Sequence, residues 1–183
     1  GSHTFAATGT YSVAVTVTDS DSDAGSDTVT FTVVDPGTGT IGAGGGTLAL
    51  TSGPEAGTRL DIPAGALSTD VSFTLSSGTA LSLAGYVTVG PAMAVAPTST
   101  TFATPVEITL PYDPAEVPDG TPTSYLVVLA HGAPVTALGA VRIDTVNHTV
   151  TCRVDDLAAG TYQAAVPVAS PLTGGGGTGS VVD

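Results

Sequence analysis

Hydrophobic and polar residues alternate along most of this chain with a period of two. The clearest example is the run VSFTLSS at residues 71–77, which carries apolar side chains at its first, third and fifth positions. This period is typical of a β-strand that buries one face and exposes the other. Similar short runs, separated by turn-forming residues, lie at residues 47–51, 58–62, 105–110, 141–144, 148–154 and 161–168. The pattern predicts many short antiparallel strands and an all-β fold.

Two stretches depart from strict alternation in an informative way. Residues 124–130, SYLVVLA, are nearly all apolar and predict a strand buried on both faces. Residues 86–96 also predict a strand, but Gly90 and Pro91 interrupt it. Such a pair favours either a bulge or a strand that passes from one sheet to another.

Proline and glycine mark where the strands end. Pro63 cannot donate to a strand ladder, so it ends the strand at residues 58–62, and Gly65 supplies a turn conformation that a Cβ would forbid. Asp113 followed by Pro114 has the order of an N-cap and a first helical position. We expect one helical turn at residues 113–117.

The first 35 residues form a separate pattern. Residues 10–18 and 28–34 alternate and predict two strands, and the acidic residues 19–27 between them predict a long hairpin loop. The order HTFAATGTYSVAVTVTD at residues 3–19 resembles the closing strands of a polycystic kidney disease (PKD) domain, an immunoglobulin-like sandwich. The Trp-x-Phe-Gly-Asp segment of that family is absent from the sequence. Because two strands cannot bury a sheet face alone, we expect this unit to be incomplete as a fold.

A second resemblance covers residues 41–168. Its motifs are GGTLAL at residues 45–50, LDIPAGALSTDVSFTL at 60–75, Gly90-Pro91, and FATPVEITLPY at 102–112. Their order and spacing resemble the ZU-five domain, a module of zonula occludens, netrin-receptor and ankyrin proteins, and this resemblance implies an antiparallel β-sandwich. Some family members cleave themselves at a His-Phe-Ser site. The comparable residues 156–162 hold neither His nor Ser, so we expect no self-cleavage here.

Two glycine-rich segments divide the chain. Residues 36–46 and 169–183 have the composition of flexible linkers. The expected organisation is therefore a partial PKD-like unit at residues 1–35, a linker at 36–46, a ZU-five-like β-sandwich at 47–168, and a disordered linker at 169–183.

The composition limits which residue types can form the core and which classes of partner the chain can bind. Hydrophobic residues make up 42% of the 183 positions, but aromatic residues make up only 5% and Trp is absent, so the core must be aliphatic. The formal net charge is −13, with three Arg and no Lys. Binding to nucleic acid or to an anionic membrane surface needs clustered positive charge, and both are disfavoured.

Four aspartates in the first hairpin form the one cation-like pattern. Asp19, Asp21 and Asp23 alternate, and Asp27 follows. Carboxylate oxygens are the ligands that calcium prefers, so this loop is a possible calcium site. The spacing does not fit a helix–loop–helix calcium loop, and a solvated Asp/Ser turn explains the same residues. We expect no other cofactor.

Catalytic chemistry has little support in the sequence. His3, His131 and His148 are scattered, and no Gly-x-Ser-x-Gly nucleophile elbow is present. Cys152 lies on the apolar side of an alternating run, which favours a buried structural thiol over a nucleophile. We therefore expect no enzymatic activity.

Tyr112 is the best candidate for an exposed binding aromatic in the main unit, because it stands between Pro111 and Pro114. A packed tyrosine at a corner of the sandwich is the interpretation that we favour. An exposed aromatic pair in the structure would support a carbohydrate platform.

These observations favour a non-catalytic structural or adhesive module. The acidic, lysine-free sequence, rich in Ala, Gly, Val and Thr, is typical of bacterial or archaeal surface proteins, so we expect an extracellular or cell-surface location. The module would act as a spacer or interaction domain, with other domains of its own chain, a surface protein or a carbohydrate as partners. The alternative is a carbohydrate- or protein-binding accessory domain of a secreted hydrolase.

Overall fold

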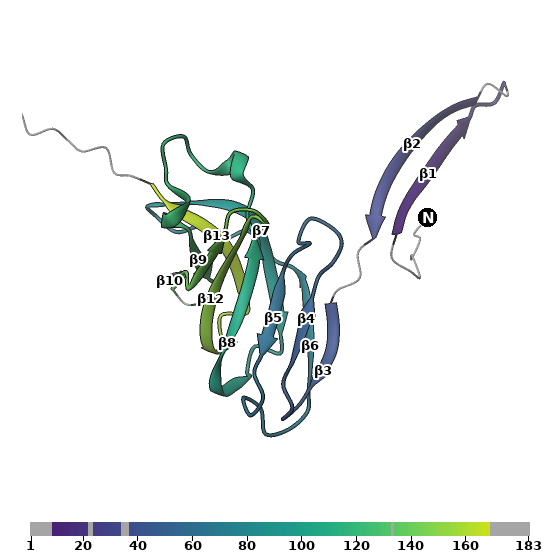
Figure 1. Ribbon diagram of the computed structural model, residues 1–183. Coiled ribbons are helices and arrows are strands. Elements are labelled where there is room, and N and C mark those ends of the chain that lie inside the picture. Colours follow the sequence, from purple (N-terminus) through teal and green to yellow (C-terminus); the bar gives the residue numbers. More distant parts are fainter. Residues whose placement is uncertain (1–8, 22–23, 34–36, 133, 169–183) are drawn as a thin grey trace, which may run out of the picture.

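The computed structural model describes residues 9–21, 24–33, 37–132 and 134–168 (Figure 1). Within these residues the chain forms thirteen strands and two short 3₁₀ turns. The first seven strands are β1 (Gly9–Thr18), β2 (Ala24–Val33), β3 (Gly37–Ile41), β4 (Gly46–Ala49), β5 (Arg59–Ile62), β6 (Val71–Ser77) and β7 (Tyr86–Ala96). The remaining elements are β8 (Thr101–Pro111), η1 (Pro114–Glu116), η2 (Thr123–Tyr125), β9 (Val127–Ala130), β10 (Thr136–Gly139), β11 (Arg142–Asp144), β12 (Thr149–Asp156) and β13 (Thr161–Pro167).

Strands β3 to β13 build two antiparallel sheets that pack face to face (Figure 1). One sheet has six strands in the order β10-β9-β13-β7-β6-β3, and the other has five in the order β11-β12-β8-β5-β4. Every pairing between neighbours in these sheets is antiparallel. The prediction of an all-β antiparallel sandwich is therefore confirmed.

The core between the sheets is almost entirely aliphatic. Leu60, Ile108 and Val150 of the five-stranded sheet are fully buried and meet buried side chains such as Leu75 and Met93 of the six-stranded sheet. Burial of apolar surface on this scale is the main favourable contribution to folding. The aliphatic core expected from the composition is thus confirmed.

Strand β7 carries the predicted interruption as a bulge. Its pairing with β13 shifts register between Gln163 and Ala165, opposite the Gly90-Pro91 pair. The strand keeps β13 as its neighbour on both sides of the shift, so it does not pass to the other sheet. Of the two interpretations of Gly90-Pro91, the bulge is confirmed.

Strand β9 is buried on both faces, as its apolar sequence predicts. Val128 and Ala130 join the main core, whereas Leu129 points to the other side of the sheet. There Leu129 packs with Leu81 and Ala165 in a second, smaller cluster. The segment between β6 and β7, which carries Leu81, thus covers part of the outside of the six-stranded sheet.

The predicted linker at residues 36–46 is wrong over residues 37–41. These residues form β3, which pairs with β6 at the edge of the six-stranded sheet. The inward positions of β3 are Gly37, Gly39 and Ile41, and a Cβ at either glycine would lie 3.1 Å from a methyl group of Leu50 or Leu48. Leu48 of β4 and Leu50 just after it fill the space that side chains at the two glycines would occupy. Glycine at two of the three inward positions therefore removes the apolar alternation that marks a strand in the sequence.

The first hairpin pairs only with itself among the described residues. Strands β1 and β2 form their own two-stranded antiparallel sheet. Val15 and Val17 of this hairpin have exposed fractions of 55% and 68%, which leaves apolar side chains in contact with solvent. Whether residues 1–35 belong to a PKD-like domain stays a prediction. The predicted linker at residues 169–183 lies outside the described residues.

The predicted helical turn after β8 is confirmed as η1. Asp113 is its N-cap, and the Asp113 carboxylate accepts a hydrogen bond of 2.8 Å from the backbone N–H of Ala115. Pro114 occupies the first helical position, where the missing N–H costs nothing.

Candidate interaction surface

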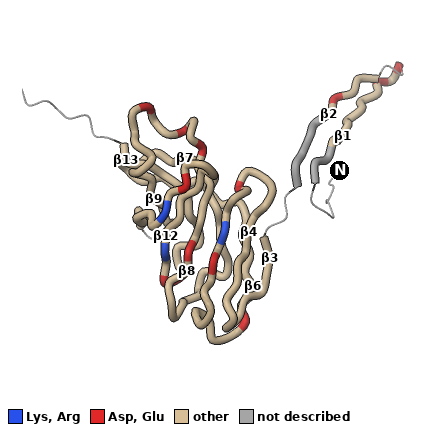
Figure 2. The backbone as a smooth tube through the Cα atoms, in the orientation of Figure 1, with Lys and Arg blue, Asp and Glu red and all other residues tan. Residues whose placement is uncertain are grey.

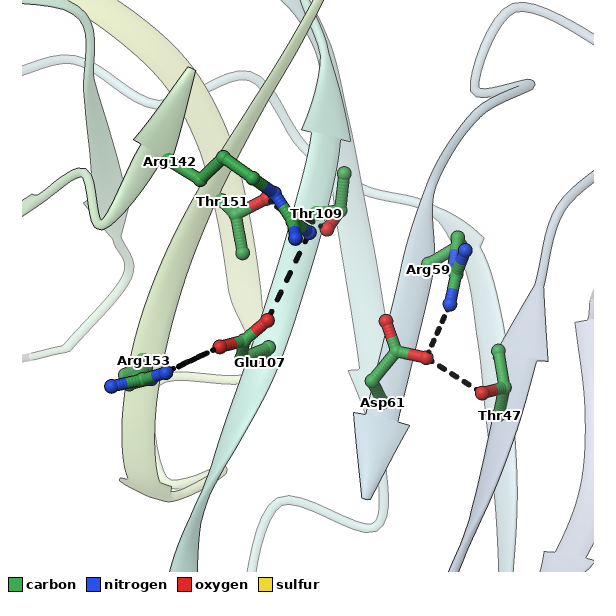
Figure 3. Close-up of polar contacts among 8 residues, drawn as sticks. All are labelled: Thr47, Arg59, Asp61, Glu107, Thr109, Arg142, Thr151 and Arg153. Carbon is green, nitrogen blue, oxygen red and sulfur yellow. Dashed lines mark hydrogen bonds and ion pairs between the residues drawn. The ribbon is translucent and has the colours of Figure 1, made fainter. Parts of the chain in front are cut away.

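All three arginines of the chain lie on strands of the five-stranded sheet, namely β5, β11 and β12 (Figure 2). On β5, Leu60 and Ile62 point into the core, so Arg59 and Asp61 point outward. The same alternation on β8, β11 and β12 brings further polar side chains to this face. We call the resulting group of eight residues the arginine face, and its members are Thr47, Arg59, Asp61, Glu107, Thr109, Arg142, Thr151 and Arg153 (Figure 3).

Strand register arranges the arginine face as two rows that cross the sheet. The first row runs through the paired residues Arg142, Thr151, Thr109 and Arg59. The second row runs through the paired residues Arg153, Glu107, Asp61 and Thr47. Neighbouring strands in a sheet lie about 4.8 Å apart, so side chains along each row are within reach of one another.

Ion pairs hold the second row together (Figure 3). Asp61 accepts hydrogen bonds of 2.6 Å from both Arg59 and Thr47. One oxygen of Glu107 accepts from two nitrogens of Arg153, at 3.0 and 2.7 Å. Because Asp61 and Glu107 stand directly opposite each other, their like charges would repel without these cations. The hydrogen bond to Asp61, followed by its negative charge, raises the pKa of Arg59.

Arg142 is held more loosely than the other two arginines. Its Nη2 atom lies 3.8 Å from Glu107 Oε2, whereas Arg153 approaches Glu107 to 2.7 Å. Arg142 also donates a long hydrogen bond of 3.4 Å to Thr151. Its side chain is 63% exposed. Three guanidinium groups share Asp61 and Glu107 on this face. Asp144, two residues along β11 from Arg142, is a third carboxylate, and its pKa is lowered by hydrogen bonds from Asn147 and, further, by the charge of Arg142.

Two buried threonines form the centre of the first row. The Thr109 and Thr151 hydroxyls lie 2.9 Å apart and hydrogen-bond to each other, and the residues are only 5% and 1% exposed. A buried hydroxyl without a partner is costly, and this pair satisfies both. The pair gives the arginine face a fixed polar centre between Arg142 and Arg59.

A cleft opens where the ladder between β5 and β8 ends. The two strands pair only as far as Asp61 and Glu107. Beyond this point Pro63 and Pro105 line the opening, and neither proline has a backbone N–H to continue the ladder. The chains meet again where the Ala103 N–H donates to the Ala66 carbonyl at 3.0 Å. The hollow holds about 580 Å³ and has Thr47 and Arg153 at its rim.

Tyr112 does not form an exposed binding platform. Its side chain is only 5% exposed, and its ring packs edge-on against His148 with 5.7 Å between ring centres. The expected exposure of Tyr112 is therefore wrong, and the packed corner tyrosine is confirmed, whereas a part of Tyr112 in binding stays a prediction. Tyr162 is buried as well and Tyr86 is half-buried, so Tyr125, at 57%, is the one exposed tyrosine in the described part of the main unit.

The structure places part of the predicted calcium loop. Asp19 and Asp21 lie at the hairpin turn, where the Asp21 N–H donates to Asp19 at 3.0 Å, and Asp27 lies on β2 opposite Val15. Asp23 lies outside the described residues. Within the described ranges, no group of three or more His, Cys, Asp or Glu side chains is placed to hold a metal ion. Calcium binding stays a prediction.

Cys152 is a buried thiol, as its position in the alternating run predicts. The residue is fully buried in the core, and this burial raises its thiol pKa to about 12. The thiolate is the nucleophilic form of cysteine, so Cys152 is held in its unreactive form at neutral pH.

Sequence reasoning did not identify the arginine face. The signal was present, because Arg59 and Asp61 alternate with buried leucine and isoleucine in the same way as Thr151 and Arg153 alternate with buried neighbours. Alternation assigns a side chain to one side of its own strand. It does not say which strands are neighbours, and the face exists only through the pairing of residues as distant in the sequence as Arg59 and Thr109.

Comparison of the sequence with protein-family models gives one match, to part of the chain. The sequence model of the ZU5 domain matches residues 37–124, from β3 into η2. The predicted resemblance to the ZU-five domain is thus confirmed over this range, and the match starts at the first residue of the strand that was taken for a linker. ZU5 domains are in general non-catalytic protein-interaction modules. No curated protein matches the chain, and no helix among the described residues is long and apolar enough to cross a bilayer.

Proposed function

We propose that this chain is a non-catalytic interaction module of a secreted or cell-surface protein, and that it docks an acidic segment of a partner on its arginine face. The ZU5 match supports a protein-interaction role in general. The choice of surface rests on one observation, which is that every cationic side chain of the chain gathers on this face.

Charge balance supports an acidic partner. A chain of net charge −13 repels acidic molecules over most of its surface, so local attraction depends on the face that gathers its three arginines. Arg142 has the longest distance to a carboxylate of the three arginines and the largest exposed fraction. A partner carboxylate that reaches Arg142 would gain a charge-assisted hydrogen bond without displacing Arg153 from Glu107.

The cleft beside the second row adds an apolar element to the same surface. Ile62, Pro63 and Pro105 supply apolar walls next to the charged side chains. A partner side chain in this hollow would be removed from water and would fix the register of the docked segment. Other domains of the same protein are partners of this kind, as is a separate surface protein.

A surface location and a spacer role belong to the same proposal. Their support is the acidic, lysine-free composition and the succession of two separate β-units, β1–β2 and β3–β13, along the chain. Protease treatment of intact producing cells should release peptides from residues 37–168. Release only after lysis would contradict the surface location.

The docking surface is tested with an acidic peptide as the probe, acetyl-Gly-Glu-Gly-Glu-Gly-amide, titrated calorimetrically at low salt. Arg142→Gln should weaken binding by about three- to tenfold, because an exposed ion pair contributes up to about 1 kcal/mol and its desolvated form somewhat more. Arg142→Lys keeps the charge and should retain most of the affinity. Equal affinity of the wild type and Arg142→Gln would overturn the choice of surface.

Photo-crosslinking then checks the position of the bound peptide. A benzoylphenylalanine at Thr104, an exposed residue that lines the cleft, should form a covalent adduct with the peptide. The matched control carries the same group at Thr38, an exposed residue on β3 of the other sheet. Adducts of equal yield at both positions would mean that the peptide binds without a defined site.

A further inference from the structure

A second hollow lies at the end of β8 and shares no lining residue with the arginine face. It holds about 490 Å³, and four prolines line it, one each from the β4–β5 loop, β7, the end of β8 and η1. The prolines are Pro54, Pro91, Pro111 and Pro114. Asp113 and Glu116 line the same hollow and are its charged residues.

The walls of this hollow are fixed by contacts within the six-stranded sheet and between the two sheets. The buried Gln163 side chain donates a hydrogen bond of 2.7 Å to the Gly90 carbonyl and so holds the bulge beside Pro91. The Asp113 N–H donates to the Val89 carbonyl at 2.8 Å. A Cβ at Gly90 would lie 2.7 Å from the Pro111 carbonyl oxygen. Strands β7 and β8 therefore approach each other too closely here for any residue larger than glycine. A site built in this way loses little conformational freedom when a ligand binds.

The charge of the hollow selects its occupant. Asp113 and Glu116 are both exposed and both negative. The three ion pairs among the described residues all use Asp61 or Glu107, so the carboxylates of this hollow are not neutralised by an arginine of the chain. Lysine and arginine combine an apolar stem, which packs on proline rings, with a cationic head that reaches a carboxylate.

We propose that the proline-walled hollow binds a lysine or arginine side chain of a basic partner segment. The basic segment lies outside residues 1–183, because these residues hold no lysine and their three arginines lie on the arginine face, each in contact with a carboxylate there. The inference is independent of the acidic partner proposed above, since the two surfaces share no residue. The module would then hold two ligands of opposite charge on separate surfaces.

The probe is acetyl-Gly-Arg-Gly-Arg-Gly-amide, titrated calorimetrically at about 50 mM salt. Its matched control peptide carries citrulline in place of arginine, which keeps the shape and removes the charge. We expect measurable binding of the arginine peptide and at least about fivefold weaker binding of the citrulline peptide.

Two double variants with the same loss of charge locate the site on the protein. Asp113→Asn/Glu116→Gln should weaken arginine-peptide binding by at least about fivefold, and asparagine can still serve as the N-cap of η1. Asp155→Asn/Asp156→Asn changes two acidic residues at the far end of β12, where Asp156 pairs with Thr101 at the start of β8, and should leave the affinity unchanged. An equal loss in both variants would show attraction to the acidic chain as a whole and would overturn the proposal.

Two further outcomes are decisive. Pro91→Ser keeps the charges but removes an apolar wall, and a loss of about twofold or more would support packing of the side-chain stem. Sedimentation of the wild type checks self-association. A concentration-dependent dimer that Arg142→Gln abolishes would identify a second copy as the occupant and would overturn the assignment to a segment outside this sequence.

Discussion

Gln163 is the side chain whose loss should destabilise the sandwich most clearly through hydrogen bonding alone. It is only 4% exposed, and its amide makes two hydrogen bonds of 2.7 Å. The oxygen accepts from the Leu81 N–H, which secures the segment that covers the outside of the six-stranded sheet. The nitrogen donates to the Gly90 carbonyl at the bulge of β7. One buried amide therefore connects three separate segments.

Gln163→Met tests this role with little change in side-chain volume. Methionine fills the same space but leaves the Leu81 N–H and the Gly90 carbonyl without their partner. Each unsatisfied buried group costs about 1–3 kcal/mol, so we expect a loss of about 2–4 kcal/mol in the free energy of unfolding. For a unit of this size the corresponding fall in Tm is about 3 °C per kcal/mol, or roughly 6–12 °C.

The assay is urea unfolding followed by far-UV circular dichroism, because the chain has no Trp to report by fluorescence. The midpoint should fall while the slope m stays constant, since the surface exposed on unfolding does not change. Gln163→Glu keeps an acceptor for the Leu81 N–H but has no donor for the Gly90 carbonyl. A loss below about 0.5 kcal/mol for Gln163→Met would refute the reasoning, because it would mean that both backbone groups find other partners.

Three further predictions follow from single contacts. Thr109→Val or Thr151→Val alone should lower the free energy of unfolding by about 1–2 kcal/mol. The double variant should lower it by less than the sum of the two single losses, measured as a double-mutant cycle by urea unfolding. Strictly additive losses would contradict the hydrogen bond between the two hydroxyls. Cys152 should resist iodoacetamide at pH 8 in the folded protein and react after unfolding, because burial raises its pKa to about 12; rapid labelling of the native chain would argue against burial. Hydrogen bonds from Asn147 lower the pKa of Asp144. The contribution of Asp144 to stability is therefore present above the ordinary carboxyl pKa and is lost as pH falls through the lowered value. Carboxyl ¹³C NMR should give a titration midpoint for Asp144 below about 3.9, and a higher midpoint would count against these bonds.

The sequence was sufficient for the strands whose inward positions carry large apolar side chains. The bounds predicted for β6 and β7 agree with the structure at both ends, because β6 alternates large apolar residues with Ser and Thr and turn residues flank both strands. Strand β3 was missed because glycine occupies two of its three inward positions, and the space is filled by Leu48 of β4 and by Leu50 just after it, next to the other sheet. Alternation detects side chains, and a strand that buries backbone gives no such signal.

The candidate surfaces depend on strand pairing, which the sequence alone does not specify. Arg59, Glu107 and Arg153 become neighbours only because β5, β8 and β12 lie side by side in register. The exposure of Tyr112 could not be judged from its flanking prolines either. Its burial follows from contact with His148, which the adjacent turn between β11 and β12 delivers.

The position of β3 has a mechanical consequence. The chain enters the sandwich through this edge strand, which pairs with β6 over five residues and has a neighbour on one side only. It leaves through β13, which lies between β7 and β9 and is paired on both sides. When the two ends of the polypeptide are pulled apart, fewer backbone hydrogen bonds resist the force at β3 than at β13. Strand β3 would therefore detach from β6 while β13 stays paired. Such a detachment would release the few residues of β3 as extended chain. It would uncover Leu48 and Leu50 before the rest of the sandwich unfolds.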